Sequence, residues 1–220
     1  MFDFEAVRSD QEVPVEFTTY SALRSTETFL ICKRGFDVAL ATCLLPILLT
    51  TAAVLIVLNP LLNRGPLIFA QIRMGRDCKP FVAYKFRTMR AARRVIRRPH
   101  DPPEAHRITR LGRFLRQTRV DEIPQIINVL KGDMSLIGPR PDYFHHARHY
   151  LQTVPGYRTR HTVKPGISGL AQTEVGYAHG AETVANKVRA DIHYIDNAGF
   201  RLEMWIFWRT VLVVFRFEGT

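Results

Sequence analysis

An uncharged apolar stretch from Val38 to Leu62 is the feature that most constrains the fold of this chain. Leu, Ile, Val and Ala dominate it, and at about 1.5 Å per residue it is long enough to cross a bilayer as a helix. Pro46 interrupts the stretch, and a proline inside a helix removes a hydrogen bond and introduces a kink. The sequence therefore predicts a membrane helix that breaks near Pro46.

Basic residues flank both ends of this stretch, with Lys33 and Arg34 before it and Arg64 after it. Basic flanks prefer the cytoplasmic side, so a single crossing would leave one flank on the unfavourable side. We therefore favour a re-entrant helix-break-helix that enters and leaves through the same membrane face. A spanning helix and a buried core helix are the alternatives. A signal peptide is disfavoured, because a polar stretch precedes the run and no clean cleavage site follows it.

The remaining pattern predicts an α+β, mainly helical protein that is membrane-associated (monotopic). Residues 67–73 and 80–87 read as two strands around a turn, which predicts a small β-hairpin with Lys85 and Arg87 on one face. Residues 201–217 hold two tryptophans, an apolar stripe and cationic ends. That pattern is typical of an amphipathic helix in the membrane interface, with a helix packed on the core as the alternative.

Three regions follow from this reading. Residues 1–28 are predicted to be a flexible N-terminal arm, and residues 29–63 the re-entrant membrane helix. Residues 64–220 are predicted to form a cytoplasmic catalytic domain that ends in the interfacial helix. Three cysteines without metal-like spacing indicate unpaired thiols in a reducing compartment.

Two adjacent carboxylates, Asp121 and Glu122, stand at the start of a segment with helical apolar spacing that Gly132 ends. We expect Asp121 at or just before a helix N-terminus, with Pro124 in the first turn. Free N–H groups and the helix dipole there would keep Asp121 ionised and would suit phosphate. An ionised carboxylate beside arginines is what an aspartyl nucleophile attacking a phosphoryl group requires. The alternative is an N-cap Asp followed by a first-turn Glu.

A formal net charge of +11 implies anionic partners: nucleic acid, phosphorylated small molecules or an acidic membrane surface. No nucleic-acid-binding module is present, which disfavours the first of these. Much of the charge lies in a basic block between residues 90 and 117, which is either a solvated face or a contact with lipid head groups. Its arginines are Arg90, Arg93, Arg94, Arg97, Arg98, Arg107, Arg110, Arg113 and Arg116.

Two further motifs carry weaker signals. His145 and His149 are spaced to share a helix face, as metal ligands can, but no further ligand supports a metal site there. Residues 164–172 form a Gly-rich loop of the kind that wraps phosphate or a sugar.

Several motifs occur together in one order. Lys33-Arg34-Gly35-Phe36-Asp37 leads into the apolar stretch, and Lys85-Phe86-Arg87-Thr88-Met89 closes the hairpin. They are followed by Asp121-Glu122-Ile123-Pro124-Gln125, Asn128-Val129-Leu130-Lys131-Gly132-Asp133, Gly138-Pro139-Arg140-Pro141 and Lys164-Pro165-Gly166-Ile167-Ser168-Gly169. From about Lys33 to Phe215 the chain strongly resembles the bacterial sugar transferases, also called polyprenyl-phosphate hexose-1-phosphate transferases or monotopic phosphoglycosyl transferases.

The resemblance implies transfer of a hexose 1-phosphate from a UDP-sugar to undecaprenyl phosphate. In the family this happens at the cytoplasmic face of the inner membrane and starts exopolysaccharide, capsule or O-antigen assembly. Implied partners are the UDP-hexose, undecaprenyl phosphate and inner-membrane lipids; nucleic acid is not one, and a homo-oligomer is left open. The chain resembles a short form without the N-terminal multi-span domain.

The resemblance also assigns roles. Asp121 is implied as the nucleophile, which accepts the phosphosugar covalently, and Glu122 as its partner in placing Mg²⁺. Arg116 and Arg140 are implied to bind phosphate, and Lys85 and Arg87 fall on an active-site motif. Adjacent residues at a helix start point about 100° apart, which independently favours different roles for the two carboxylates.

The sequence departs from many relatives after Gln172, where it reads Thr173-Glu174-Val175-Gly176-Tyr177-Ala178-His179-Gly180. This leaves the sugar undecided between glucose, which we favour, and galactose. A non-catalytic membrane-surface protein is the competing interpretation of the whole chain.

Overall fold

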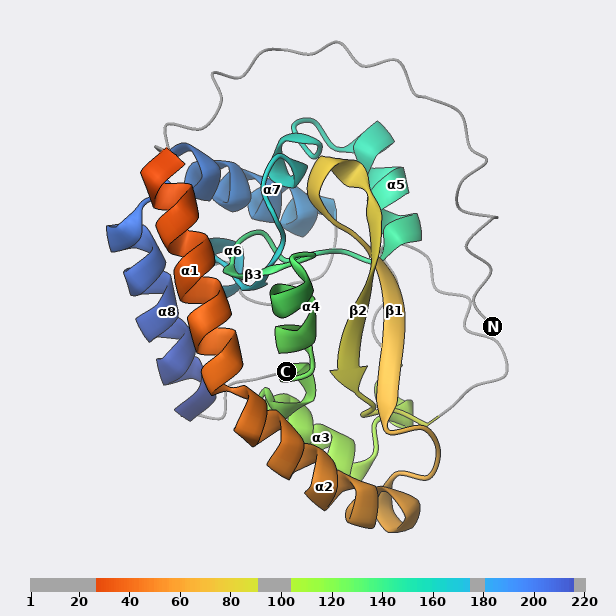
Figure 1. Ribbon diagram of the computed structural model, residues 1–220. Coiled ribbons are helices and arrows are strands. Elements are labelled where there is room, and N and C mark those ends of the chain that lie inside the picture. Colours follow the sequence, from red (N-terminus) through yellow and green to blue (C-terminus); the bar gives the residue numbers. More distant parts are fainter. Residues whose placement is uncertain (1–26, 91–103, 175–180, 216–220) are drawn as a thin grey trace.

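The computed structural model describes residues 27–90, 104–174 and 181–215 (Figure 1). The described part is mainly helical, with two small two-stranded sheets, and the prediction of a mainly helical α+β fold is confirmed. Most of the predicted N-terminal arm lies outside the described residues. So do Arg93, Arg94, Arg97 and Arg98, and most of the divergent segment after Gln172.

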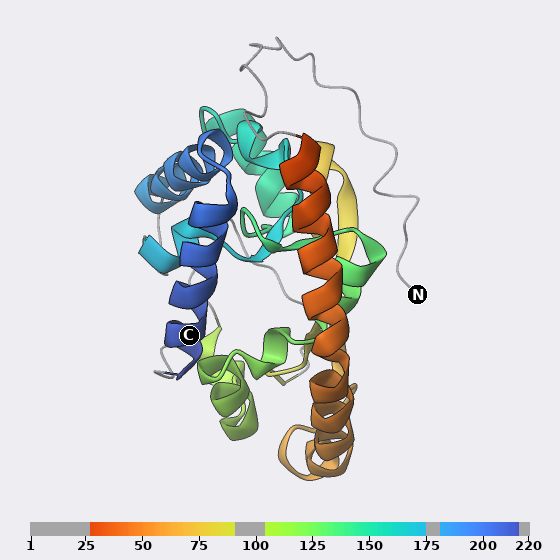
Figure 2. The same cartoon turned by 60° about the vertical axis from the view of Figure 1, so that its left-hand side comes forward.

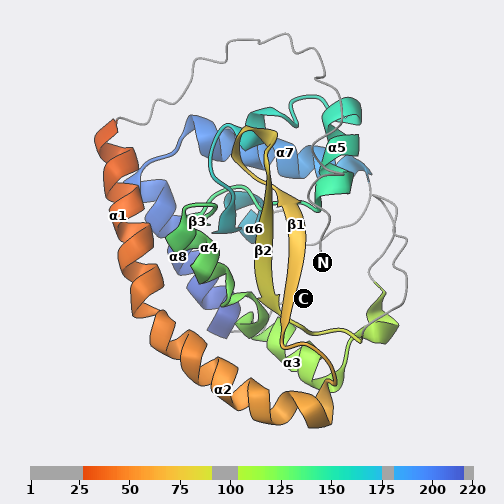
Figure 3. The same cartoon turned by 45° about the vertical axis from the view of Figure 1, so that its right-hand side comes forward.

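A bent pair of helices, α1 (Glu27–Cys43) and α2 (Leu45–Leu62), runs along one side of the molecule (Figures 1 and 3). The break falls at Leu44, and Pro46 lies in the first turn of α2, where its missing N–H is best tolerated. The predicted break near Pro46 is confirmed. Within the described residues, Glu27–Leu62 is the one helical segment that is long enough and apolar enough to cross a membrane, judged by length and composition.

Helix α1 is attached to the rest of the protein by its polar residues. Lys33 donates a hydrogen bond to the Ile137 carbonyl (3.0 Å) and pairs with Glu203 (2.6 Å). Arg34 donates to the carbonyls of Val129 (2.7 Å) and Leu130 (3.1 Å), in the last turn of α4 (Gln125–Lys131). Such carbonyls have no partner within their own helix, and the helix dipole favours a cation there. Lys33 and Arg34, which precede the apolar stretch in the sequence, therefore lie within α1 and attach this helix to the rest of the protein.

Helix α2 buries only one narrow side. Leu48 and Leu55 join the core, whereas Leu49, Val57 and Leu61 are 68%, 69% and 76% exposed. Soluble proteins rarely leave so continuous an apolar surface in water. The alternative of a buried core helix is therefore wrong.

The predicted β-hairpin is confirmed. Strands β1 (Ile68–Met74) and β2 (Pro80–Phe86) pair antiparallel, with Phe69 opposite Lys85. The connecting turn η2 (Arg76–Cys78) has Asp77 and Cys78 in the left-handed region, at φ 57° and 59°. The inner face of β2 contributes Phe86 to a core shared with α2, α3 and α4.

The middle of the chain forms the region around the carboxylates. A short turn η3 (Ala105–Arg107) precedes α3 (Arg110–Gln117), and a 3₁₀ turn η4 (Val120–Glu122) connects α3 to α4. Strand β3 (Ser135–Ile137) then pairs in parallel with β4 (Gly166–Ser168).

The predicted Gly-rich loop, residues 164–172, contains β4 and packs against Gly138. A Cβ on Gly166 would lie 2.1 Å from the Gly138 nitrogen, and one on Gly169 would lie 2.2 Å from the Gly138 oxygen. Only glycines allow these backbones to approach so closely. These contacts bring the loop that carries Arg140 against β4, and the wrapping of phosphate or a sugar by the Gly-rich loop stays a prediction.

Five further elements complete the described part of the fold: α5 (Phe144–Thr153), η5 (Thr159–His161), α6 (Leu170–Glu174), α7 (Ala181–Asp196) and α8 (Phe200–Phe215). Helix α8 lies beside α1 (Figures 1 and 2), with the Phe29 and Phe200 rings 5.1 Å apart. Ile206 on α8 is fully buried, whereas Trp205 and Trp208 are 41% and 59% exposed. The helix packs on the core, as the alternative interpretation expects, and also presents an exposed aromatic face. Its position in a membrane interface stays a prediction.

Candidate active site

The two carboxylates lie in a tight turn that begins at Arg119. Arg119 adopts the left-handed conformation (φ 59°, ψ 9°) and is the N-cap of η4, while Pro124 is the N-cap of α4. Asp121 caps neither element, so the interpretation of Asp121 as an N-cap is wrong. The carboxylate is thereby left for other interactions.

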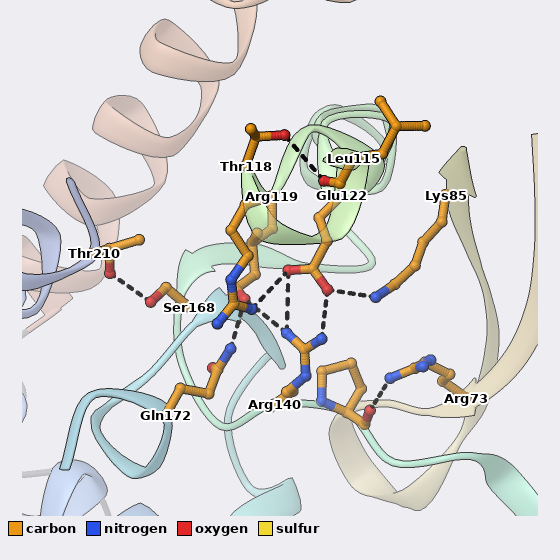
Figure 4. Close-up of polar contacts among 12 residues, drawn as sticks. Arg73, Lys85, Leu115, Thr118, Arg119, Glu122, Arg140, Ser168, Gln172 and Thr210 are labelled. Carbon is orange, nitrogen blue, oxygen red and sulfur yellow. Dashed lines mark hydrogen bonds and ion pairs between the residues drawn. The ribbon is translucent and has the colours of Figure 1, made fainter. Parts of the chain in front are cut away.

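Glu122 is the centre of a cationic cluster (Figure 4). Its carboxylate accepts hydrogen bonds from Lys85 of β2 and from Arg140, whose Nη1 also lies 3.3 Å from the second carboxylate oxygen. Arg119 adds a looser ion pair, with 3.6 Å between its Nη1 and the same oxygen. We call Glu122 and these three cations, together with Asp121 and Arg116, the Glu122 cluster.

The surroundings separate Glu122 electrostatically from its neighbour. Burial alone would raise the pKa of Glu122, but the charges of Arg140 and Lys85 and the Arg140 hydrogen bond outweigh burial and hold the pKa well below its usual range. Burial also lowers the pKa of Lys85 to about 8, although the Glu122 charge opposes this. Glu122 is therefore a fixed anion that positions cations.

Asp121 has a different environment. It is 7% exposed and makes no hydrogen bond with another described residue. Burial, followed by the neighbouring Glu122 charge, raises the pKa of Asp121 to about 6, while Lys85, Arg116 and Arg140 lower it. The expectation that the helix start would keep Asp121 strongly ionised is thus corrected: its surroundings raise the pKa instead of lowering it. A carboxylate of raised pKa that is not bonded to a cation is a better nucleophile than a tightly paired one.

The loop that carries Arg140 is fixed from two sides. Arg160 donates to the Arg140 carbonyl (2.8 Å), and Arg73 of β1 donates to the Pro141 carbonyl (2.5 Å). Arg140 itself also lies 3.4 Å from the Ile167 carbonyl of β4. These contacts aim the guanidinium at Glu122.

The structure brings together five of the six residues that the sequence assigned to the site: Asp121, Glu122, Lys85, Arg116 and Arg140. Arg87 lies elsewhere. Its guanidinium donates to the Asn63 carbonyl at the end of α2 and lies over Gly65, where a Cβ would be 2.3 Å from Nη1. The strand ends at Phe86, so the alternation that would have placed Arg87 beside Lys85 does not continue.

Sequence reasoning missed Arg119, Arg73 and Arg160. Arg119 stands two residues before Asp121, and that proximity was a usable signal. Its left-handed backbone carried no signal, because this conformation normally favours Gly or Asn. Arg73 and Arg160 act through backbone carbonyls, which have no sequence signature.

The donor set bears on whether a metal fits. In residues 27–90, 104–174 and 181–215, no group of three or more His, Cys, Asp or Glu side chains could hold a metal ion, and this includes the surroundings of His145 and His149. Mg²⁺ is commonly held by one or two carboxylates together with substrate phosphates. Asp121 fits that arrangement, whereas both oxygens of Glu122 already face Arg140 and Lys85.

Comparison with known proteins identifies the family. The family model described as bacterial sugar transferase matches residues 28–217. The chain belongs to the bacterial sugar transferase family, and the resemblance found in the sequence is confirmed.

Individual relatives carry more specific names. The chain is 37% identical over 196 residues to the UDP-N-acetylgalactosamine-undecaprenyl-phosphate N-acetylgalactosaminephosphotransferase of Aeromonas hydrophila, covering 88% of this chain and 46% of that protein. It is 37% identical over 190 residues to the UDP-glucose:undecaprenyl-phosphate glucose-1-phosphate transferase of Escherichia coli K12, covering 84% of this chain and 39% of that protein. An exopolysaccharide production protein of Rhizobium leguminosarum is 35% identical, with 83% and 94% covered. The chain thus spans less than half the length of the first two relatives.

Proposed function

We propose that this protein transfers a hexose 1-phosphate from a UDP-sugar to undecaprenyl phosphate, through a covalent phosphosugar intermediate on Asp121. The names of relatives that act on UDP-sugars and undecaprenyl phosphate support the two substrates. One observation carries the mechanism: of two adjacent buried carboxylates, Glu122 is bonded to cations and Asp121 is not.

In the first half-reaction an Asp121 carboxylate oxygen attacks the sugar-bearing phosphorus. A new P–O bond forms, the bond to the bridging oxygen breaks, and that oxygen leaves with the electron pair as UMP. Lys85, Arg116 and Arg140 lie close enough to lower the pKa of Asp121, so the same charges can stabilise the diphosphate as the bond breaks.

In the second half-reaction an oxygen of the lipid phosphate attacks the same phosphorus. Asp121 leaves as a carboxylate and the lipid-linked diphosphate sugar is released. No proton transfer is required in either step, since both nucleophiles and both leaving groups are oxyanions. Glu122 keeps Lys85 and Arg140 in place throughout.

Magnesium is part of the proposal. Asp121 would hold the ion together with the substrate diphosphate, and Glu122 would contribute only by releasing one of its cations. A bound Mg²⁺ would neutralise diphosphate charge as UMP departs.

The protein is proposed to act at the cytoplasmic face of the inner membrane, in exopolysaccharide, capsule or O-antigen assembly. The name of the Rhizobium relative supports the first of these. The relatives' names include both glucose and N-acetylgalactosamine, so we place UDP-glucose first in a panel that also includes UDP-galactose and UDP-N-acetylgalactosamine.

The test of the nucleophile is Asp121→Asn, assayed for UMP release and for sugar transfer to undecaprenyl phosphate. Both activities are expected to vanish while the protein still binds liposomes, because the amide cannot form the acyl phosphate. Asp196→Asn is the matched control, since Asp196 is exposed at the end of α7 and should retain full activity. Full transferase activity in Asp121→Asn would exclude the covalent mechanism. Liposome binding without UMP release in the wild type would favour the non-catalytic alternative.

We further propose that α1 and α2 form a re-entrant element with both ends on the cytoplasmic side. Lys33 and Arg34 hold α1 to the catalytic region, and Asn63, directly after α2, donates to the Arg87 carbonyl (2.6 Å). Contacts at both ends with the same polar region favour this arrangement over a single crossing.

Single cysteines at Thr28 and Arg64, both exposed, test the topology in a chain whose Cys32, Cys43 and Cys78 are replaced by Ser. Neither site should react with a membrane-impermeant maleimide in intact cells, and both should react after lysis. Labelling of one site alone in intact cells would establish a spanning helix.

A further inference from the structure

An apolar cavity of about 220 Å³ opens beside the Glu122 cluster. Leu40, Leu44 and Ile47 form one wall, at the break between α1 and α2. Phe207, Val213 and Val214 of α8 form the facing wall. Arg119 and Glu122 also line the cavity and are the charged residues of its lining, whereas Asp121 is not part of the lining. The cavity is therefore mainly apolar and is charged where it borders the Glu122 cluster.

We infer that this cavity binds the isoprene unit nearest the phosphate of the lipid acceptor, and that Arg119 receives that phosphate. This inference rests on the proposed function and adds to it a subsite for the second substrate.

The cavity is continuous with the apolar surface of the bent helix. Ile47 lines the cavity and is also 51% exposed, next to the exposed Leu49 on the same helix. On the facing side, α8 presents Trp208 and Leu212 outward, 59% and 47% exposed. A lipid whose tail lies along these surfaces can enter the cavity without crossing water.

Most polar groups in the cavity walls are already engaged within the protein. The hydroxyls of Ser168 and Thr210 bond to one another at 2.6 Å, and Thr210 also donates to the Ile206 carbonyl. The Gln172 amide nitrogen is bonded to the Ile167 carbonyl, whereas its Oε1 has no hydrogen-bond partner among the described residues. With the donors engaged and one acceptor left, the side walls offer mainly apolar contact, which an isoprenoid matches.

The charge beside the cavity suits a phosphate. Arg119 lines the cavity and lies 3.6 Å from Glu122, next to the cations Lys85 and Arg140 of the Glu122 cluster. A guanidinium binds phosphate readily through its paired N–H donors. The left-handed backbone at Arg119 sets the turn that presents this side chain to the cavity.

The size of the cavity sets how much lipid it holds. A water molecule occupies about 30 Å³, so the cavity accommodates roughly seven non-hydrogen atoms of similar size. One five-carbon isoprene unit fits, and the remainder of the tail would stay in the membrane. Selectivity for the lipid should therefore depend on the first unit.

Val213→Trp, which fills the cavity from α8, tests the inference. Met204→Trp is its matched control, since Met204 lies on the same helix, is 46% exposed and does not line the cavity. In the full chain in nanodiscs, we expect Val213→Trp to raise the KM for undecaprenyl phosphate at least tenfold. Its stoichiometric burst of UMP, measured without acceptor, should stay within twofold of wild type. Met204→Trp should leave both quantities within twofold. Leu44→Phe, which fills the cavity from the opposite wall, should reproduce the effect of Val213→Trp if the cavity itself is used.

Neryl phosphate, which carries two isoprene units, provides a second readout. It should inhibit transfer to undecaprenyl phosphate far better than inorganic phosphate does, and Val213→Trp should abolish that advantage. An unchanged KM in both filled variants, or inhibition by neryl phosphate no stronger than by inorganic phosphate, would overturn the inference. So would loss of the UMP burst in Val213→Trp, which would assign the cavity to the nucleotide. Absence of a UMP burst in the wild type would instead contradict the proposed function.

Discussion

Two buried ion clusters in this protein use the same kinds of side chain with opposite charge balance. In the Glu122 cluster, four cations (Lys85, Arg116, Arg119 and Arg140) face two carboxylates, and the surplus is positive. In the second, which we call the Arg160 cluster, a single guanidinium is paired with Asp142 and with Asp191, the latter at 2.8 Å. Tyr157 also donates to Asp142 (2.7 Å), so both carboxylates are paired with members of the Arg160 cluster, while Arg160 Nε is buried without a hydrogen-bond partner among the described residues.

The two clusters meet in one short segment. Arg140 points to Glu122 while Asp142, two residues later, points to Arg160, and Arg160 also holds the Arg140 carbonyl. Arg160 and Asp191 are 3% and 1% exposed, whereas Arg140 and Lys85 are 23% and 16% exposed at the side chain. The closed cluster thus serves as a rigid support, and the open one retains charge for a substrate.

The largest effect is expected from Arg160→Met, which removes the central cation of the closed cluster. Asp191, at 1% exposed, would remain buried without a cation, and Asp142, at 32% exposed, would lose its ion pair. Leaving a buried charge unpaired costs about 3–5 kcal/mol of folding free energy. Urea titration in detergent, followed by circular dichroism, measures the change. Arg110→Met, at an exposed position of α3, should stay within about 0.5 kcal/mol of wild type. A loss below about 1 kcal/mol in Arg160→Met would show that the cluster is solvated rather than closed.

In the Glu122 cluster, Glu122→Gln should lower activity strongly and stability only slightly. Lys85 and Arg140 would lose the anion that positions them, and misplacement of catalytic groups by about 1 Å costs on the order of 100-fold in rate. The kcat/KM for UMP release is expected to fall by about that factor. The loss of folding free energy should be less than half that of Arg160→Met, because both cations can reach solvent. Equal destabilisation by the two substitutions would remove the distinction between the clusters.

Local signals in the sequence predicted the features that depend on neighbouring residues. Pro46 marked the helix break, and Gly75 with its neighbours marked the hairpin turn. The docking of α1 had no such signal. Lys33 and Arg34 bind backbone carbonyls 104 and 95 residues away. Every residue has a backbone carbonyl, so the sequence does not indicate which one is the partner.

Most residues of the candidate site were predicted from the sequence, but the roles of these residues were predicted less well. The adjacency of Asp121 and Glu122 is visible in the sequence, but which of them is paired depends on Lys85 and Arg140, 37 and 18 residues from Glu122. The Arg160 cluster was not predicted at all. Its members are spread from Asp142 to Asp191 and converge only through the packing of α7 against η5.

The smallest predicted effect tests whether His161, beside the Arg160 cluster, stays unprotonated in the folded protein. His161, next to Arg160, is 5% exposed, and its Nδ1 lies 3.1 Å from the Gly75 carbonyl oxygen. Burial, followed by the Arg160 charge, lowers the pKa of His161 to about 3. Below about pH 6.5, His161 binds a proton in the unfolded chain but not in the folded protein. The contribution of His161 to stability is therefore complete above that pH and is lost progressively as the pH falls towards 3, by at most about 1.4 kcal/mol per pH unit.

Asp191 acts in the opposite direction, so the wild-type curve alone does not isolate His161. Burial raises the pKa of Asp191 to about 6, and its contribution to stability grows as the pH falls below that value. His161→Gln leaves Asp191 in place. Between pH 6 and 4 its unfolding free energy should fall less steeply than that of wild type, by about 1 kcal/mol per pH unit, in urea titrations at several pH values. Equal slopes in the two proteins would mean that His161 takes up a proton in the folded state, and that the Arg160 cluster is as open to solvent as the Glu122 cluster.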